Sequence, residues 1–173
     1  MTPPSKVKVL IVEDSPVVQQ LLVHIVADDP RLEVAGVASS GEEALRLIER
    51  AKPDVVSLDI RLPGIDGFEV TKRLMRQHPV PIVVVAADVN DLDIPMRALQ
   101  AGALTVVEKP VGVGRDDYQA VARHLCTQLH SMSQVKVIRQ RAERFGTRAA
   151  SADLVPAAYP QLPAQVTRQA EQG

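Results

Sequence analysis

Short runs of apolar, mostly β-branched residues alternate along this chain with longer amphipathic stretches. Five such runs, at residues 7–12, 32–38, 54–59, 81–87 and 104–109, have the length and composition of β-strands. In the stretches that follow them, apolar residues recur at every third or fourth position, which is the spacing of one face of a helix. The pattern therefore predicts five successive strand–helix units.

Residues that favour helix starts mark two of the predicted helices. Ser15 followed by Pro16 is typical of an N-cap and the first helical position. Ser40, with Glu43 three residues later, forms a capping box. The spacing of apolar residues places the remaining helices at about residues 68–77, 93–101 and 118–129.

Strands that are joined through helices run parallel, with right-handed crossovers. The expected fold class is α/β, with a flavodoxin-like five-stranded parallel sheet in the order 2-1-3-4-5 and helices on both faces. Composition fits this fold, because 46% of the 173 residues are hydrophobic but Trp is absent and Tyr and Phe occur twice each. Val, Leu, Ile and Ala must then fill the core, as in helix-covered parallel sheets.

Charged residues occur where the first, third and fifth predicted strands end. Glu13 and Asp14 follow the first, Asp59 ends the third, and Lys109 ends the fifth. The carboxyl ends of the first and third strands meet at the switch point of such a sheet, where ligands bind. Carboxylates held close together repel each other unless they share a cation, and Mg²⁺ needs only one or two carboxylates when phosphate completes its site. Asp14 and Asp59 therefore predict a Mg²⁺ site, with Lys109 as a second positive charge.

An acid between a metal ion and a lysine suits phosphoryl transfer, because this chemistry depends mainly on positioning and on neutralising the charge of the transferred group. Asp59 would be the nucleophile and would form an acyl phosphate. A single Asp after a strand is often only a helix cap or a turn residue. Charged residues at three strand ends favour a functional site over that interpretation.

Three motifs resemble those of a known family. Glu13-Asp14-Ser15, the stretch SLDIRLPGIDG and the tripeptide EKP are similar to the motifs of receiver domains of two-component response regulators. The resemblance covers about residues 6–129, and we predict a receiver domain at residues 6–130. Within the family, VEDSPVV, SLDIRLPGIDG and AGALTVVEKP are most similar to the receiver of chemotaxis protein-glutamate methylesterases.

The resemblance implies a role for each matching residue. Asp59 would be the phosphoacceptor, and Asp14, Asp59 and the backbone carbonyl of Arg61 would bind Mg²⁺. Glu13 would hold a metal-bound water, and Lys109 would contact the phosphoryl group. The phosphate would come from a histidine kinase or a small phosphodonor, and the output would be binding to another protein that the sequence does not name.

Two positions depart from the family pattern. Receivers usually carry Thr or Ser at the end of the fourth strand, where the hydroxyl bonds to the phosphoryl group, and an aromatic residue in the fifth. Ala86 and Val106 occupy these positions here. We therefore expect phosphorylation to shift the structure only weakly. The resemblance also implies a cis peptide bond before Pro110.

The composition changes after residue 130. Residues 131–173 are first basic and then rich in Pro, Ala and Gln, so we expect a largely disordered tail. We find no helix-turn-helix pattern and no nucleophile elbow of a methylesterase domain, so neither nucleic-acid binding nor methylesterase activity is expected. A single cysteine, Cys126, at a core position, and the lack of a signal peptide or membrane-span pattern predict a cytoplasmic protein without a membrane partner.

Two alternatives stay open. One is a pseudo-receiver, an interaction module that ignores phosphate; Ala86 and Val106 favour it, whereas retention of Asp14, Asp59 and Lys109 opposes it. The other is the regulatory part of a longer methylesterase, because SQVKVIRQRAERFG resembles the start of the interdomain linker in those enzymes.

Overall fold

The structure, a computed structural model, describes residues 2–139. Strands and helices alternate along these residues, as the sequence predicts. The strands are β1 (Val7–Val12), β2 (Leu32–Ala38), β3 (Val55–Asp59), β4 (Ile82–Ala86) and β5 (Thr105–Glu108). The helices are α1 (Pro16–Asp28), α2 (Gly41–Ala51), α3 (Gly67–Gln77), α4 (Asp93–Ala101) and α5 (Arg115–Ser133).

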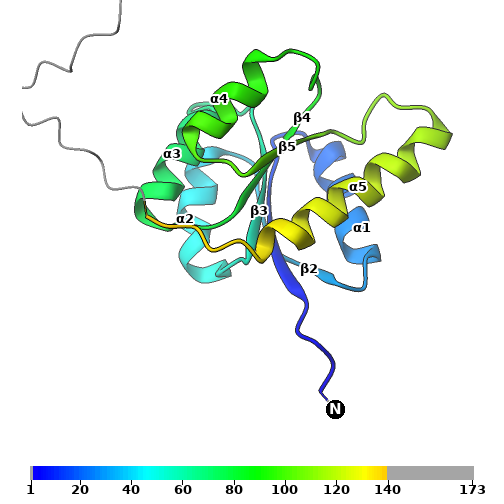
Figure 1. The fold of residues 1–173 in the computed structure, drawn as a ribbon, viewed down its shortest axis with the longest axis horizontal. Helices are drawn as coiled ribbons and strands as arrows, with labels where there is room; N and C mark the ends of the chain where they lie inside the picture. Colours follow the sequence, from blue (N-terminus) through cyan, green and yellow to red (C-terminus); the bar gives the residue numbers. More distant parts are fainter. Residues whose placement is uncertain (1, 140–173) are drawn as a thin grey trace, which may run out of the picture. The chain divides into compact units, whose positions relative to one another are not determined.

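The five strands form one parallel sheet in the order β2-β1-β3-β4-β5 (Figure 1). This is the predicted flavodoxin-like order, in which chain direction across the sheet reverses beside β1. β1 and β3 are therefore neighbours, with Val12 opposite Leu58 in the last paired position. The residues that follow these two strands emerge side by side at one end of the sheet.

Helices cover both faces of the sheet (Figure 1). One apolar layer lies under α2, α3 and α4, and a second lies under α1 and α5. Alternate residues of each strand point to opposite layers, so that Leu10 of β1 belongs to the first and Ile11 to the second. Every residue of β3 and β4 is buried, because both of their faces are covered.

The predicted helix starts at Ser15 and Ser40 are confirmed, since each side chain accepts a hydrogen bond from a backbone N–H in the first turn of its helix. Asp66 caps α3 in the same way, which the apolar spacing did not indicate. Strand ends differ from the prediction by one residue at several places. β4, for example, begins at Ile82, because Pro81 has no backbone N–H for the sheet.

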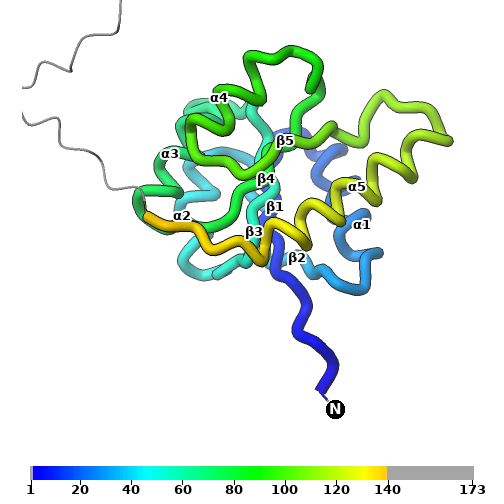
Figure 2. The backbone as a smooth tube through the Cα atoms, in the orientation of Figure 1, coloured from blue at the N-terminus to red at the C-terminus, as the bar shows by residue number. Residues whose placement is uncertain are grey.

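The chain crosses to the other face of the sheet after α5. The predicted boundary at residue 130 falls inside this helix, which continues to Ser133. Residues 134–139, which we call the strap, then run towards α2 and α3 (Figure 2). Val137 packs against the apolar layer under α2 to α4, and Arg139 donates a hydrogen bond of 3.2 Å to the carbonyl of Gln77 at the end of α3. The rest of the expected disordered tail, residues 140–173, lies outside the described residues.

None of the helices in residues 2–139 combines the length and the apolar character that crossing a membrane would require.

Candidate functional site

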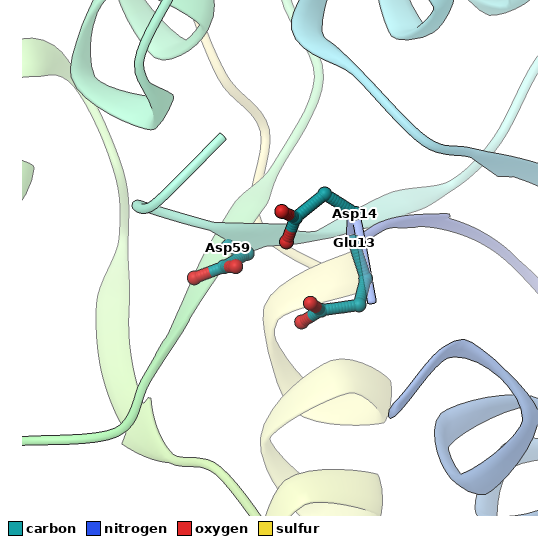
Figure 3. A group of neighbouring side chains, drawn as sticks. All are labelled: Glu13, Asp14 and Asp59. Atoms are coloured by element: carbon teal, nitrogen blue, oxygen red, sulfur yellow. The ribbon is translucent and has the colours of Figure 1, made fainter. Parts of the chain in front are cut away.

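Three carboxylates converge at the end of the sheet where β1 and β3 finish. Glu13 and Asp14 follow β1, and Asp59 is the last residue of β3. One oxygen from each of the three lies within 4.8 Å of the others (Figure 3). Glu13 and Asp59 are buried, whereas Asp14 is exposed, so the group opens to solvent on the Asp14 side. The structure therefore brings together the three acids that the sequence singled out.

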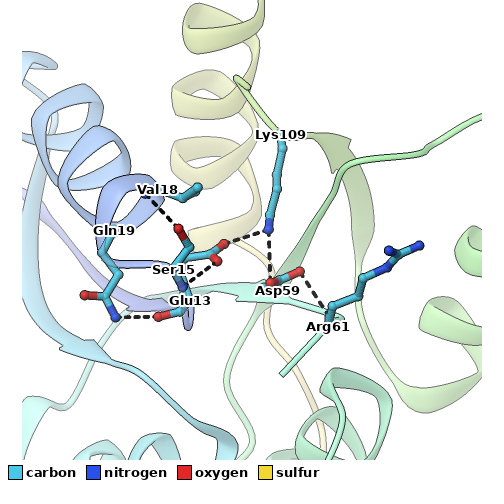
Figure 4. A network of polar contacts seen from close by, with 7 residues as sticks. All are labelled: Glu13, Ser15, Val18, Gln19, Asp59, Arg61 and Lys109. Carbon is cyan, nitrogen blue, oxygen red and sulfur yellow. Dashed lines mark hydrogen bonds and ion pairs between the residues drawn. The ribbon is translucent and has the colours of Figure 1, made fainter. Parts of the chain in front are cut away.

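Glu13 is held by several hydrogen bonds. Its backbone N–H donates to the carbonyl of Ala38 in β2, at 3.0 Å. Its side-chain Oε1 accepts the backbone N–H of Ser15 at 3.1 Å, which folds the carboxylate back over the start of α1 (Figure 4). Nε2 of Gln19 in α1 donates to the Glu13 carbonyl. The same atom is 2.9 Å from Ser39 Oγ, to which it also donates. The sequence patterns gave no reason to select Gln19, because its role depends on how the loops after β1 and β2 meet.

Asp59 is held at its backbone and at its carboxylate. Oδ1 accepts the backbone N–H of Arg61 at 3.1 Å. The chain returns at Gly67, whose N–H donates to the carbonyl of Ile60 at 2.9 Å. A Cβ at Gly67 would collide with the carbonyl oxygen of Asp59, so only glycine lets α3 begin this close to the acid.

Lys109 lies between two of the acids. Its Nζ is 2.8 Å from Glu13 Oε2 and 3.0 Å from Asp59 Oδ2, and its side chain is 11% exposed (Figure 4). The lysine follows β5 and donates its backbone N–H to the carbonyl of Ala86, at 2.9 Å. This bond fixes the end of β5 against the end of β4, and the long side chain reaches from there to β3.

Burial and charge act against each other in this group. Burial raises the pKa of Glu13; the Lys109 hydrogen bond lowers it only in part, and the Asp59 charge raises it again. Burial disfavours the charged form of Lys109, but hydrogen bonds and attraction from Glu13 and Asp59 outweigh it, so the lysine pKa is raised. Lys109 therefore stays charged at neutral pH. One ammonium cannot balance three carboxylates, so the site retains a negative charge that attracts a cation.

The donor atoms of the group fit a hard divalent cation. They are carboxylate oxygens only, and two of the acids are fixed by backbone hydrogen bonds. Mg²⁺ prefers oxygen ligands and keeps several waters, which the open side at Asp14 can accommodate. Nitrogen or sulfur ligands that would favour zinc are absent from this group.

Of the two departures from the family pattern, Ala86 lies beside the acids and Val106 does not. Ala86, at the end of β4, lines a cavity of about 30 Å³ together with Asp59, Lys109 and Ile94 of α4. Val106 packs in β5 against the apolar layer under α2 to α4. Neither side chain can donate a hydrogen bond, as the sequence indicates.

One expectation is wrong. The described chain has no cis peptide bond, so the bond before Pro110 is trans rather than cis. The two isomers of a bond to proline differ by only about 0.5–1 kcal/mol in the absence of other constraints, so local context decides between them. A motif shared with relatives does not fix that context.

Comparisons with known proteins match one family over most of the described chain. The model for the response regulator receiver domain matches residues 9–123. Protein-glutamate methylesterase/protein-glutamine glutaminase 2 of Paramagnetospirillum magneticum is 55% identical over 141 residues, which are 80% of this chain and 40% of that protein. Protein-glutamate methylesterase/protein-glutamine glutaminase 1 of Syntrophus aciditrophicus is 50% identical over 136 residues, 78% of this chain and 39% of that protein.

Solved structures give the same result. The response regulator domain of Thermotoga maritima CheB is 29% identical, with a TM-score of 0.69, and the match covers 76% of this chain and 99% of that one. A response regulator from Chloroflexus aurantiacus is 32% identical, with a TM-score of 0.59, over 72% of this chain and 98% of that one. The chain spans about 40% of the length of the curated relatives it matches. The similarity to methylesterase receivers that the motifs predict is confirmed.

Proposed function

Because this chain belongs to the response regulator receiver family, we propose that it carries a two-component signal by phosphorylation of Asp59, with Mg²⁺ as cofactor, and by binding another protein. One observation carries the proposal: the carboxylates of Glu13, Asp14 and Asp59 and the ammonium of Lys109 meet at one end of the sheet. This combination of charges suits the transfer of a phosphoryl group to a carboxylate.

Asp59 acts as the nucleophile in this proposal. One of its carboxylate oxygens forms a bond to phosphorus while the bond between phosphorus and the donor's leaving group breaks, which leaves an acyl phosphate on Asp59. The leaving group takes up a proton from solvent or from the donor itself. Oδ1 of Asp59 accepts the N–H of Arg61, and Oδ2 forms an ion pair with Lys109. The carboxylate is therefore oriented before the phosphodonor binds.

Asp14, Asp59 and the backbone carbonyl of Arg61 would hold Mg²⁺, and Glu13 would hold one of its waters. When bound, the ion supplies positive charge to the oxygens of the transferred group. The exposed carboxylate of Asp14 is placed to receive the ion from solvent, and the buried carboxylate of Asp59 ties the site to the sheet.

Besides the metal ion, the side chain of Lys109 supplies positive charge at the site. It pairs with Glu13 and Asp59 in the structure described here, and a phosphoryl group on Asp59 would add oxygens within reach of the same ammonium. Glu13 keeps the lysine at the site in either state, because its carboxylate stays fixed by the N–H of Ser15.

The partners follow from this chemistry. The phosphoryl group comes from a histidine kinase or from a small phosphodonor such as acetyl phosphate, and the phosphorylated domain acts on an output protein. Neither nucleic acid nor a membrane is needed. We place the protein in the cytoplasm, a location that a single cysteine without a second one to pair with supports.

A second candidate function is regulation of a methylesterase domain. It is favoured by the 55% identity to a protein-glutamate methylesterase of which this chain covers 40%. In that case the receiver would control a protein-glutamate methylesterase domain. Reading the gene beyond the codon for Gly173, and assaying methylesterase activity with and without phosphodonor, distinguishes this candidate from a receiver that acts on a separate protein.

The test of the main proposal is phosphorylation in solution. Incubation with acetyl phosphate or phosphoramidate and Mg²⁺ is expected to add one phosphoryl group, detected by intact mass, and Asp59→Asn is expected to abolish it. Removal of Mg²⁺ with a chelator should have the same effect. A wild-type protein that stays unmodified at saturating donor and Mg²⁺ would replace this proposal with a pseudo-receiver that signals without phosphate.

A further inference from the structure

The loop between β3 and α3 carries the carbonyl that the proposed metal site needs. Its residues 61–65 leave the sheet directly after Asp59, and the base of the loop is closed by the hydrogen bond from Gly67 N–H to the Ile60 carbonyl, at 2.9 Å. That bond fixes where the loop begins and ends. It does not fix the orientation of the peptide groups between these points.

Among the described residues, two side chains accept hydrogen bonds from the backbone of this loop. One is Asp59, whose Oδ1 accepts the N–H of Arg61 at 3.1 Å. The other is Glu42, in the first turn of α2, whose Oε1 accepts the N–H of Ile65 at 3.3 Å. The first bond uses the carboxylate that binds the metal ion and receives phosphate. Of the two acceptors, Glu42 is thus the one that takes no part in the proposed chemistry of the site.

The surroundings of Glu42 are built for this contact. Gly64 has φ +75°, a left-handed conformation, and a Cβ at this position would fall 2.7 Å from Glu42 Oε1. The carboxylate therefore lies directly against the turn of the loop. The side chain of Ile65 lies close to Gly41, where a Cβ would fall 2.7 Å from it. A Cβ at Gly41 would also collide with the side chain of Val70, so a larger residue there would push α2 away from the loop and α3, whereas Gly64 is favoured by its left-handed φ.

The charge of Glu42 is kept at neutral pH. Hydrogen bonds from its own backbone N–H and from Ile65 N–H lower the pKa of this carboxyl group. Both hydrogen bonds stabilise the carboxylate form, so the acceptor is present throughout the range in which the protein would bind Mg²⁺.

We propose that Glu42 is a positioning residue that holds the β3–α3 loop, and with it the Arg61 carbonyl, in the conformation that binds Mg²⁺. This inference rests on the proposed function of the site. Glu42 does not touch the ion or the phosphoryl group; it raises the fraction of molecules in which the loop is ready to bind. A ligand's apparent dissociation constant rises in proportion as that fraction falls.

The test compares three variants of the full chain with wild type. Each is titrated with Mg²⁺, and binding is measured by calorimetry or by amide NMR shifts. Glu42→Ala removes the acceptor, whereas Glu42→Gln removes the charge but keeps an oxygen that can accept the N–H of Ile65. Glu49→Ala is the matched control, because Glu49 lies on the same helix but pairs with His78, away from the site. We expect Glu42→Ala to weaken Mg²⁺ binding by about three- to tenfold, if the ready fraction falls to about a third to a tenth, and Glu42→Gln and Glu49→Ala to stay within about twofold of wild type.

A second measurement needs no metal ion. Amide hydrogen exchange in the metal-free protein should become faster at Ile65 in Glu42→Ala and stay near wild type in Glu42→Gln, while the melting temperatures of all three variants remain similar. Equal Mg²⁺ affinity in wild type and Glu42→Ala, or an equal loss in Glu42→Ala and Glu42→Gln, would overturn the positioning role and leave the proposed function intact. A wild-type protein that does not bind Mg²⁺ at all would reject the proposed function, and the positioning role with it.

Discussion

Nζ of Lys109 lies 3.0 Å from Oδ2 of Asp59, although these residues come from strands that are separated in the sheet by β4. The lysine side chain reaches past the end of β4, where it lines a small cavity together with Ala86. The same ammonium is 2.8 Å from Glu13 Oε2, so one cation links the ends of β1, β3 and β5. The stability of the protein and the proposed phosphoryl transfer therefore involve the same contact.

Replacement of Lys109 by Met is expected to destabilise the metal-free protein. It leaves the buried carboxylates of Glu13 and Asp59 without their cation, and removing one partner of a buried ion pair typically costs about 3–5 kcal/mol. We expect a loss of about 3–5 kcal/mol at pH 7.5, measured by urea unfolding. Lys72→Met, on the exposed surface of α3, is the control and should have little effect.

The pH dependence of this variant has a definite sign. The pKa of Glu13 is already raised in the folded protein, and loss of Lys109 raises it further. The folded state then holds a proton more tightly than the unfolded state, so the destabilisation is largest at pH values above the raised pKa and shrinks as the pH falls towards it. A loss of stability that does not shrink between pH 7.5 and the lowest pH at which the variant stays folded would contradict this account.

Phosphorylation is expected to shift α4 and β5 only weakly. A hydroxyl at position 86 would bond to the phosphoryl group, and a hydrogen bond to a charged group is worth about 1.5–3 kcal/mol, comparable to typical coupling energies of about 1–3 kcal/mol. Ala86 lacks that group. NMR chemical-shift changes on adding beryllofluoride should therefore be smaller at residues 93–101 and 105–107 than near Asp59.

The variant Ala86→Thr tests this explanation. We expect it to strengthen the response at α4 and β5 in part, since Val106 cannot act as an aromatic latch. Ala86→Val is the matched control, because it fills the cavity of about 30 Å³ with nearly the same volume but offers no hydroxyl. Shifts in the wild-type protein that are as large at α4 and β5 as at Asp59 would show that the hydroxyl is not required.

The strap should contribute measurably to stability through Val137. This side chain is partly buried against the apolar layer under α2 to α4, so Val137→Ala is expected to cost about 1 kcal/mol and to lower the melting temperature by about 2–4 °C. The neighbouring Ile138 is 83% exposed, and Ile138→Ala should leave the melting temperature unchanged. Equal effects of the two substitutions would mean that the strap is not docked in solution.

Cys126 should react slowly with thiol reagents in the folded protein. Burial, together with the charge of Asp29, raises the pKa of this thiol to about 11. Only a small fraction is thiolate at pH 7.5, and the thiolate is the reactive form. Labelling with a disulfide reagent should be slow in buffer, with little gain up to pH 9, and rapid in denaturant. Fast labelling of the folded protein would show that α5 opens readily from the sheet.

The fold could be read from the sequence because each strand–helix unit carries its own local signal. Apolar runs, helical spacing and the caps at Ser15 and Ser40 agree with one another, and few topologies satisfy five such units. The acids could be identified for a related reason. Parallel strands end at the same edge of a sheet, so residues placed after the first and third strands must approach each other once the order 2-1-3-4-5 is assumed.

Contacts between segments that are distant in sequence could not be predicted without the tertiary structure. The roles of Gln19 and Glu42 depend on how loops from different units meet, and the packing of Val137 depends on the path of the chain after α5. The trans bond before Pro110 belongs to the same class, because the two isomers differ little in energy until neighbouring groups are in place. Local patterns thus determined the elements and the acids of this protein. The three-dimensional arrangement decided which of those acids pair with Lys109 and which side chains hold the loops around them.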